Sequence, residues 1–246
     1  MRSELIGPGS TRPAGPLAFP PLPHFLDNII WQAFAGPQAR FTVGTGRIRR
    51  YAPGLSPIIG AIDPARPEFA ALAPFCQPGE HFYCGGWQGT APAGWKIEEE
   101  STMCRMVWAG PPQLADEATG ARLLGPQHAA PALALAELTH PGPFGPRTLE
   151  LGDYFGFFAG DRLVAMAGER MQAGRYREIS GVCTHPEFQG RGYARRLINT
   201  LLHRQLARGE LPFLHVMSAN THARGLYERF GFRVHCEVVV RVVRFG

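Results

Sequence analysis

The chain has 246 residues, of which 45% are hydrophobic and 18% charged, so it is no disordered protein and can bury a large core. Its net charge of +5 comes from scattered arginines and a single lysine, Lys96, which does not indicate a nucleic-acid surface or partner. No apolar run reaches the roughly 18 residues of a membrane span, and no secretory signal is recognisable. We therefore expect a cytoplasmic protein without a membrane partner.

The first half of the chain is expected to contain a proline- and glycine-rich lead at 1–23 and then a unit of short strands at 24–110. The lead should be mobile. The unit should begin with a helix at 27–34, and the polar run at 98–100 is interpreted as a solvated turn. Its other predicted elements are strands at 41–43, 47–51, 58–62, 80–84 and 102–108 and a short helix at 67–75.

The second half should follow a linker at 111–119 and form one unit at 120–246. Its pattern predicts strands at 121–124, 154–158, 163–170, 176–184, 212–217 and 232–244, and helices at 127–138, 190–208 and 220–230. Leucines recur at helical spacing in 190–208, which indicates one apolar face. This order of elements indicates an α/β (α+β) fold, in which a mixed sheet is flanked by helices.

The loop at 139–148 is stiffened by three prolines. A pre-ordered loop often contacts a ligand when it lies beside a site. It can equally be a rigid connector, and the residues alone leave both interpretations open.

Cysteine and histidine spacing points away from disulfides and metals. The five cysteines are widely spaced and form no C-x-x-C pair, which favours buried free thiols. Cys183 lies in an apolar strand without a local basic partner, so we interpret it as a buried thiol and not as a nucleophile. The histidines follow no metal-ligand spacing, and we predict no metal site.

The highest density of special residues lies between Glu178 and Ala194. A β-branched strand leads through a His-Pro turn and two glycines, Gly190 and Gly192, into the amphipathic helix. Glycines let the backbone approach a ligand, and the start of a helix attracts an anion by up to about 1–2 kcal/mol. The stretch therefore predicts a diphosphate cradle, although it lacks the signatures of a Walker loop and of a dinucleotide site.

Two segments resemble the GNAT acyltransferase superfamily. Residues 184–194 read Thr-His-Pro-Glu-Phe-Gln-Gly-Arg-Gly-Tyr-Ala, which is similar to its acyl-coenzyme A signature. Residues 220–232 read Asn-x-x-Ala-x-x-Leu-Tyr-x-x-x-Gly-Phe, which resembles its second conserved segment. The resemblance covers about residues 120–246, and its closing part is similar to the subgroup named for a fruit-fly protein and related to glycine N-acyltransferases.

This resemblance implies the GNAT fold, with a mixed, mostly antiparallel sheet flanked by helices. Residues 24–110 would then be a degenerate copy of the fold or a packing partner. The resemblance also implies acetyl-CoA, or another acyl-CoA, as co-substrate. The implied binding residues are Val182, Cys183 and Thr184 for the pantetheine arm, Gln189, Gly190, Arg191, Gly192, Tyr193 and Ala194 for the pyrophosphate, and Asn220 and Tyr227 near the thioester.

Two residues are candidates for catalysis. By the resemblance, Tyr227 would be the general acid for the departing thiolate; alternatively, it packs in the core. Glu178 would be the base, because it lies six residues before Thr184, where some family members have a catalytic glutamate. Strand alternation places Glu178, Ser180, Val182 and Thr184 on one face. Alternatively, Glu178 is a solvent-facing carboxylate paired with Arg175 or Arg177, and water takes the proton.

The function expected on this basis is N-acyl transfer from acetyl-CoA to a primary amine, by direct attack in a ternary complex. A non-catalytic acyl-CoA sensor with the same fold is the alternative. The acceptor, a small molecule or a protein, is not identified, and a homodimer is left open.

Overall fold

The computed structural model describes residues 25–111 and 120–246. The predicted lead at 1–23 and positions 112–119 of the predicted linker lie outside this part of the chain. Within it, the strands of both predicted units join one sheet.

Eleven strands make up this sheet among the described residues, and most neighbouring strands are antiparallel. They follow the spatial order β1-β2-β3-β4-β11-β5-β10-β9-β8-β7-β6. Among the described pairs, only β3 with β4 and β9 with β10 are parallel. The strands are β1 (Thr42–Gly44), β2 (Ile48–Tyr51), β3 (Ile58–Ala61), β4 (His81–Gly85), β5 (Trp95–Trp108), β6 (Arg122–Leu123), β7 (Tyr154–Ala159), β8 (Arg162–Ala173), β9 (Tyr176–Thr184), β10 (Leu211–Met217) and β11 (Phe232–Phe245).

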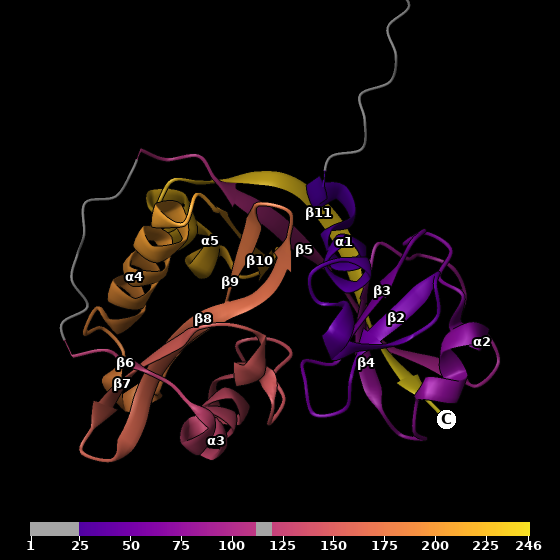
Figure 1. Ribbon diagram of the computed structural model, residues 1–246, viewed down its shortest axis with the longest axis horizontal. Helices are drawn as coiled ribbons and strands as arrows, with labels where there is room; N and C mark the ends of the chain where they lie inside the picture. Colours follow the sequence, from indigo (N-terminus) through magenta and orange to yellow (C-terminus); the bar gives the residue numbers. More distant parts are fainter. Residues whose placement is uncertain (1–24, 112–119) are drawn as a thin grey trace, which may run out of the picture.

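Helices flank the sheet in both lobes of the molecule (Figure 1). The α-helices are α1 (Ile29–Ala35), α2 (Phe69–Leu72), α3 (Ala129–Thr139), α4 (Tyr193–Ala207) and α5 (Thr221–Arg229). In Figure 1, α3, α4 and α5 lie in the lobe of β6 to β10, whereas α1 and α2 lie with β1 to β4. The long strands β5 and β11 connect the two lobes. The expected class, a mixed and mostly antiparallel sheet flanked by helices, is confirmed.

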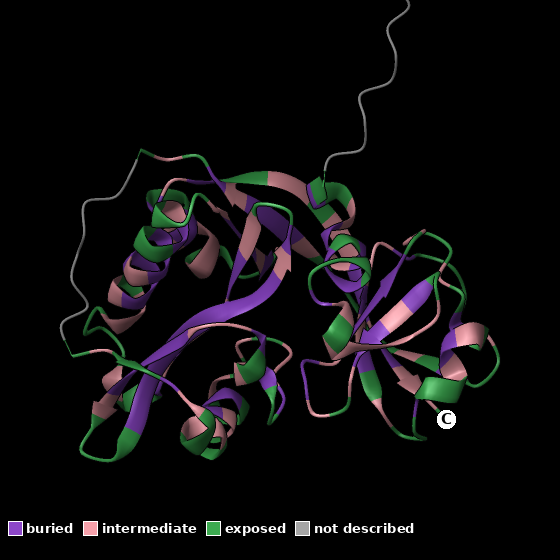
Figure 2. Cartoon of the chain, viewed as in Figure 1, coloured by how far each residue is buried: buried purple, intermediate pink, exposed green. Residues whose placement is uncertain are grey.

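The predicted apolar face of α4 anchors this helix on the sheet. Leu197, Ile198, Leu201 and Leu202 are fully buried, and α4 packs against β8 and β9. Full burial of a leucine or isoleucine contributes about 1.5–3 kcal/mol, so this face fixes the helix firmly. Figure 2 shows the buried residues along β8 and on the inner side of α4. The start of α4 is therefore held in a fixed place relative to the end of β9.

A second apolar cluster joins the two lobes. Leu26, Ile29 and Phe34, in and just before α1, pack in one cluster with Met171 of β8 and Phe213 of β10. All five side chains are almost completely buried. Because α1 contacts strands of both lobes, this cluster keeps the lobes at a fixed spacing.

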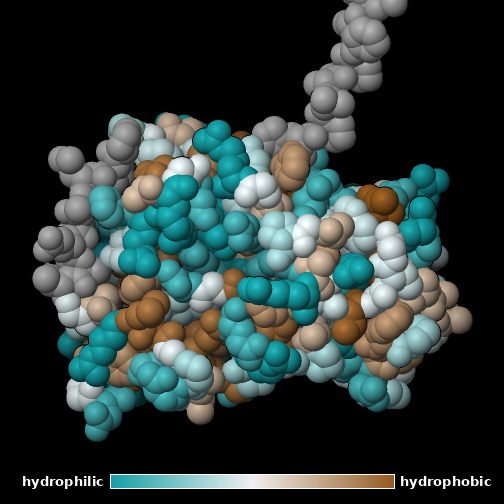
Figure 3. Space-filling view, in the orientation of Figure 1, coloured by the Kyte–Doolittle hydropathy of each residue, from teal (hydrophilic) through white to brown (hydrophobic). Residues whose placement is uncertain are grey.

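The surface of the molecule is mixed. Figure 3 shows hydrophilic side chains over much of the upper part of this face and hydrophobic ones gathered lower down, over the region of α3, β7 and β8. Of the cysteines, Cys236 is partly exposed and the other four are buried, and all are free thiols. Among the described helices, none combines the length and the apolar character that crossing a membrane requires.

The two lobes repeat one arrangement of strands. In the C-terminal lobe β7, β8 and β9 are antiparallel, β9 is parallel to β10, and β10 is bordered by β5. In the N-terminal lobe β1, β2 and β3 are antiparallel, β3 is parallel to β4, and β4 is bordered by β11. Thus β5, the last strand of the first half of the chain, borders the parallel pair of the C-terminal lobe, and β11, the last strand of the second half, borders that of the N-terminal lobe. The repeat agrees with a degenerate copy in the first half, and the predicted boundary at 111–119 divides the chain but not the sheet.

The glutamates at 98–100 belong to strand β5, so their interpretation as a solvated turn is wrong. Glu99 lies opposite Val242 of β11, and Glu100 lies opposite Arg241. Ladder hydrogen bonds to β11 hold this polar stretch in a strand, although its side chains show no apolar alternation.

Candidate active site

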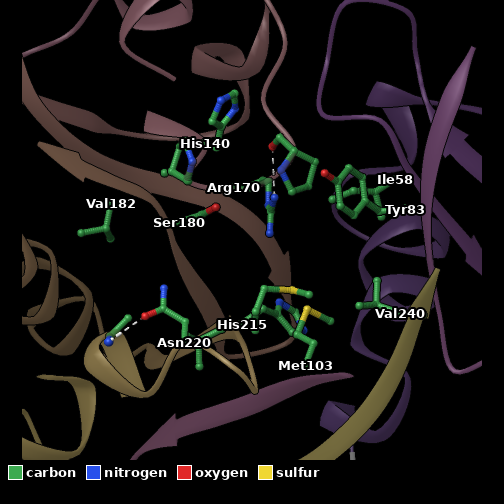
Figure 4. Close-up of a pocket in the computed structure, with 18 of the residues that line it drawn as sticks. Ile58, Tyr83, Met103, His140, Arg170, Ser180, Val182, His215, Asn220 and Val240 are labelled. Atoms are coloured by element: carbon green, nitrogen blue, oxygen red, sulfur yellow. Dashed lines mark hydrogen bonds between the residues drawn. The ribbon is translucent and has the colours of Figure 1, made fainter. Parts of the chain in front are cut away.

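A pocket of about 380 Å³ lies between the two lobes (Figure 4). Val182 of β9 and Asn220, next to α5, line one side of it. Ile58 of β3 and Tyr83 of β4 line the opposite side. The loop that follows α3 closes another side through His140 and its neighbours up to position 143. Of the two interpretations of the 139–148 loop, the structure therefore favours the one in which it borders a site.

Strand β9 has a free edge where it enters the pocket. β9 and β10 are paired only from Tyr176 to Glu178, after which β10 continues beside β5 alone. From Ile179 to Thr184, β9 therefore keeps β8 as its ladder partner on one side only. An edge of this kind presents backbone N–H and C=O groups to an extended ligand with amide groups.

A bulge in β9 changes which of its residues face the pocket. Gly181 has a φ of +62°, and the pairing with β8 shifts by one residue between Ser180 and Cys183. As a result Ser180, Gly181 and Val182 all line the pocket, which the predicted strict alternation does not allow. Cys183 has a buried side chain, and burial raises the pKa of its thiol to about 11. Such a thiol is protonated and unreactive near neutral pH.

The predicted diphosphate cradle lies beyond the end of β9. Gly190 and Gly192 both have a φ of +76°, and a Cβ added at either position would meet no atom within 4 Å. The first bond into α4 runs from the N–H of Arg196 to the carbonyl of Gly192. The N–H groups of Tyr193, Ala194 and Arg195 therefore precede the helical ladder, and the helix dipole adds positive potential there.

Side chains around the cradle fit an anionic group. The Gln189 amide donates to the carbonyl of Thr184 (3.3 Å), which ties the loop to the end of β9. The exposed Arg191 side chain lies over the Phe188 ring at 4.6 Å and donates to the carbonyl of Glu187. A positive, open loop of this kind fits a pyrophosphate, and the residues Gln189 to Ala194 are the ones that would hold it.

Asn220 lies at the same end of the pocket as Val182 (Figure 4), and Tyr227 of α5 also lines the pocket, in the apolar cluster against which Val182 packs. The Oδ1 atom of Asn220 accepts from the N–H of Ala223 (3.0 Å), so this side chain also caps α5. Tyr227 is 9% exposed, and its ring packs edge-on against Phe232. Burial, and then the neighbouring Cys183, raise the pKa of Tyr227 to about 12. Its phenol is therefore protonated near neutral pH, although the side chain also contributes to the core.

Glu178 is neither solvent-facing nor paired with Arg175 or Arg177, so that alternative is wrong. Its carboxylate is completely buried and accepts two hydrogen bonds from Arg170, at 2.7 and 3.0 Å. His215 Nδ1 donates to the same carboxylate at 2.7 Å. Burial alone would raise the pKa of Glu178, but Arg170 and His215 outweigh it and lower the pKa to about 2. A carboxylate this weakly basic, with both oxygens occupied, is poorly suited to the base role that the resemblance implied.

Arg170, His215 and Arg105 were not found from the sequence. Arg105 Nε donates to His215 Nε2 at 3.0 Å, so His215 carries its proton on Nδ1. Burial lowers the pKa of His215, which keeps the imidazole neutral. Arg170 also donates to the carbonyl of Pro143, which fastens the pocket loop. No local motif marks these residues, because the network joins four strands, β5, β8, β9 and β10, and a distant loop.

The part of the chain that the structure describes holds no group of three or more His, Cys, Asp or Glu side chains that could bind a metal ion. The groups that line the pocket are instead suited to hydrogen bonding and to charge recognition. Its far wall comes from β3, β4, β5 and β11, which no sequence motif connected with the site.

The family model described as FR47-like protein matches residues 154–242. No curated protein matches the chain.

Several solved structures share the fold. A protein assigned to the GNAT family from Novosphingobium aromaticivorans is 33% identical, with 91% of this chain and 100% of that chain covered and a TM-score of 0.82. A GCN5-related N-acetyltransferase from Kribbella flavida is 18% identical, with coverages of 89% and 95% and a TM-score of 0.56. A Drosophila protein is 13% identical, with coverages of 81% and 73% and a TM-score of 0.52. The last two likenesses concern the fold alone. The match to the Novosphingobium protein spans nearly the whole of both chains, and with the FR47-like match it shows that this chain belongs to the GNAT family.

Proposed function

We propose that the protein is an N-acyltransferase that transfers an acyl group, in the simplest case acetyl, from a coenzyme A thioester to a primary amine. One observation carries the proposal. The free edge of β9 leads directly into a glycine loop at the start of α4. The pantetheine arm of coenzyme A, lying like an added strand, and the diphosphate would therefore bind to one continuous segment. Val182, Cys183 and Thr184 would bind the arm through their backbone, and Gln189 to Ala194 would bind the diphosphate.

In this proposal the thioester supplies an activated acyl carbon at the end of the pocket near Asn220 and Tyr227. The amine nitrogen bonds to that carbon in a ternary complex, and the carbon–sulfur bond breaks. Backbone N–H groups on the free edge of β9 would stabilise the oxygen that becomes negative during the attack. Tyr227 would donate to the departing sulfur, since its raised pKa keeps the phenol protonated.

The amine must lose one proton and the thiol must gain one. Glu178 would not accept this proton directly, because Arg170 and His215 occupy its oxygens. We assign Glu178 the role of holding Arg170 and His215 in the pocket wall, and we propose that water takes the proton.

Thiol release tests this proposal. The full chain is mixed with acetyl-CoA and with a panel of small amines, amino acids and peptides, and free thiol is measured. We expect release that depends on at least one amine. If coenzyme A binds in calorimetry but no amine releases thiol, the enzyme proposal fails and a non-catalytic acyl-CoA sensor becomes the better account.

A further inference from the structure

Glu99 is a carboxylate in the pocket wall that is not neutralised by a basic partner. Its neighbours have arginine partners: Glu98 lies 3.4 Å from Arg244, and Glu100 pairs with Arg241 at 2.6 Å. Within the described residues Glu99 forms no ion pair, and it is the member of this run that lines the pocket. The function proposed above gives it no role.

A β-bulge directs Glu99 to the pocket. Val243 lies opposite Ile97 and Val242 lies opposite Glu99, so Glu98 is an extra residue in β5. Without the extra residue, alternation would place Glu99 on the same face as Ile97, in the apolar cluster of the N-terminal lobe. Bulges of this kind occur where a side chain must be turned to a new direction, often beside a functional site.

Pairing across the sheet places Glu99 far from the thioester end. Glu99, Ser101 and Met103 all line the pocket at every second position of β5. Met103 is paired with Met217, close to Asn220, so it marks the thioester end. Glu99 lies four residues further along the strand, which corresponds to about 13 Å.

The wall beside this stretch of β5 is largely apolar. Glu99 is in one cross-strand row with Val242, Tyr83 and Ile58, and Ser101 is in the next row with Val240. These residues all line the pocket. A ligand lying along β5 would therefore contact aliphatic side chains between its two ends.

The charges in the pocket leave Glu99 as the group that a ligand can neutralise. Arg170 is balanced by Glu178, and His215 is neutral. Burial, and then the Glu99 charge, raise the pKa of Tyr83, so its phenol is also neutral near pH 7. Glu99 is exposed to solvent at the rim of this apolar recess, where its carboxylate can attract a positively charged group from a ligand.

We propose that Glu99 is a specificity-determining residue and that the acceptor is a small, elongated amine with a second positive group. Glu99 binds this second group while the first amine lies at the thioester end, and an aliphatic chain joins the two along β5. The role of the first amine rests on the proposed acyl transfer, but the binding of the second group does not.

The test uses octamethylenediamine as the probe and calorimetry of the full chain saturated with coenzyme A. Glu99→Gln should weaken diamine binding about fivefold, and Glu99→Lys should weaken it at least about tenfold. Glu98→Gln makes the same change one residue away, and it should leave the affinity within about twofold of that of the unchanged protein. Coenzyme A should bind equally well to all four proteins.

Turnover gives a second, separate result. With acetyl-CoA, the unchanged protein should release thiol with octamethylenediamine more efficiently than with octylamine, and Glu99→Gln should remove most of this preference. Diamine binding that is absent, or that is unaffected by both Glu99 variants, overturns the proposal; so does an equal loss in Glu98→Gln. Diamine binding that depends on Glu99 but brings no thiol release contradicts the acyl transfer and supports the Glu99 site.

Discussion

The two lobes contain the same strand arrangement, and in each lobe the two parallel strands separate after a few paired residues and leave a wedge-shaped gap. Only the C-terminal lobe keeps this wedge open. In the N-terminal lobe, β3 and β4 are paired only at Ile58 and Ile59, so the same kind of free edge begins at Gly60. There the Asn28 amide donates to the carbonyls of Ala61 (2.9 Å) and Ile62 (3.2 Å). The side-chain amide of Asn28 thus lies at the free edge of β3 in the way that an amide of the pantetheine arm would lie at the free edge of β9.

Helix α1 completes the closure of the N-terminal wedge. A Cβ on Gly60 would meet the side chains of Ile30 and Phe34 within 3 Å, so the helix lies directly against β3. The remaining cavity is only about 10 Å³, compared with about 380 Å³ in the open pocket. In the N-terminal lobe the chain's own side chains therefore fill this gap, and the lobe serves as a wall of the pocket.

The segments that follow the two free edges differ as well. In the C-terminal lobe, Gly190 and Gly192 precede the 15-residue helix α4. In the N-terminal lobe the corresponding helix, α2, has 4 residues and follows a stretch with Pro64 and Pro67. So short a helix has a weak dipole, and prolines remove N–H donors. The same fold thus carries a candidate anion site in one lobe and not in the other.

Removing the buried carboxylate Glu178 should have the largest effect. Glu178→Gln leaves the Arg170 charge buried without its counter-charge and should lower the free energy of unfolding by about 3–5 kcal/mol. The pair of Arg147 with Glu150 is instead about half exposed on both sides. Glu150→Gln should therefore cost at most about 1 kcal/mol. Urea unfolding of both variants measures the difference, and equal losses would contradict the account of the pocket wall.

Acid should act through the same carboxylate. The pKa of Glu178 is about 2 in the folded chain and 4.5 ordinarily, so its contribution is complete above pH 4.5 and is lost as the pH falls towards 2. Urea unfolding at several pH values should show a shallower acid dependence for Glu178→Gln than for the unchanged protein. The same acid dependence in both proteins would assign the acid sensitivity to other groups.

Tyr227→Phe should affect turnover and not cofactor binding. Phenylalanine keeps the contact with Phe232 but removes the donor to the departing sulfur, so kcat should fall about 100-fold. Coenzyme A affinity, measured by calorimetry on the same variant, should stay within about twofold. An unchanged kcat would make Tyr227 a core residue only.

Gly192→Asp should weaken coenzyme A binding at least about tenfold, because it places a carboxylate and a Cβ where the diphosphate is expected. Gly209, near the other end of α4, is a matched control. It also has a positive φ and open space around it, so Gly209→Asp carries similar backbone strain. Calorimetry should show normal affinity for the control. Normal affinity in a folded Gly192→Asp variant would exclude the loop as the diphosphate site.

Substitutions of Asn220, beside the open wedge, and of Asn28, in the closed wedge, should give the smallest effects. Asn220→Ala loses the cap of α5 and should cost about 1 kcal/mol of stability, whereas Asn220→Asp keeps an oxygen for the N–H of Ala223. Both should weaken coenzyme A binding about threefold, because both lose the amide N–H₂ group. Asn28→Ala should also cost about 1 kcal/mol but leave coenzyme A binding unchanged. Unchanged binding in Asn220→Asp would reduce Asn220 to a helix cap.

Most of the fold could be predicted from the sequence, because hydrophobic periodicity and glycine positions are local signals. The helix predicted at 190–208 is α4, which begins at Tyr193 because Gly192 has a positive φ. Strand β5 was predicted only from 102, although it begins at Trp95. Its polar stretch has one face in the pocket and the other paired with arginines, so no apolar alternation marks it.

The candidate site could be predicted only where it is local in sequence. Gln189 to Ala194, Asn220 and Tyr227 belong to two short segments that motif spacing reveals. The row that contains Glu99 and Tyr83 depends on register between distant strands. The surroundings of Glu178 depend on an irregularity in the pairing of β8 with β9 near Arg170, which no sequence pattern indicates.

A calorimetric titration of the full chain with coenzyme A tests the comparison of the two lobes most directly. We expect saturable binding of one molecule per chain, weakened at least about tenfold in Gly192→Asp and unchanged in Gly209→Asp and in Asn28→Ala. Two molecules per chain, or binding that depends on Asn28 and not on Gly192, would contradict the assignment of the open wedge of β9 as the coenzyme A site.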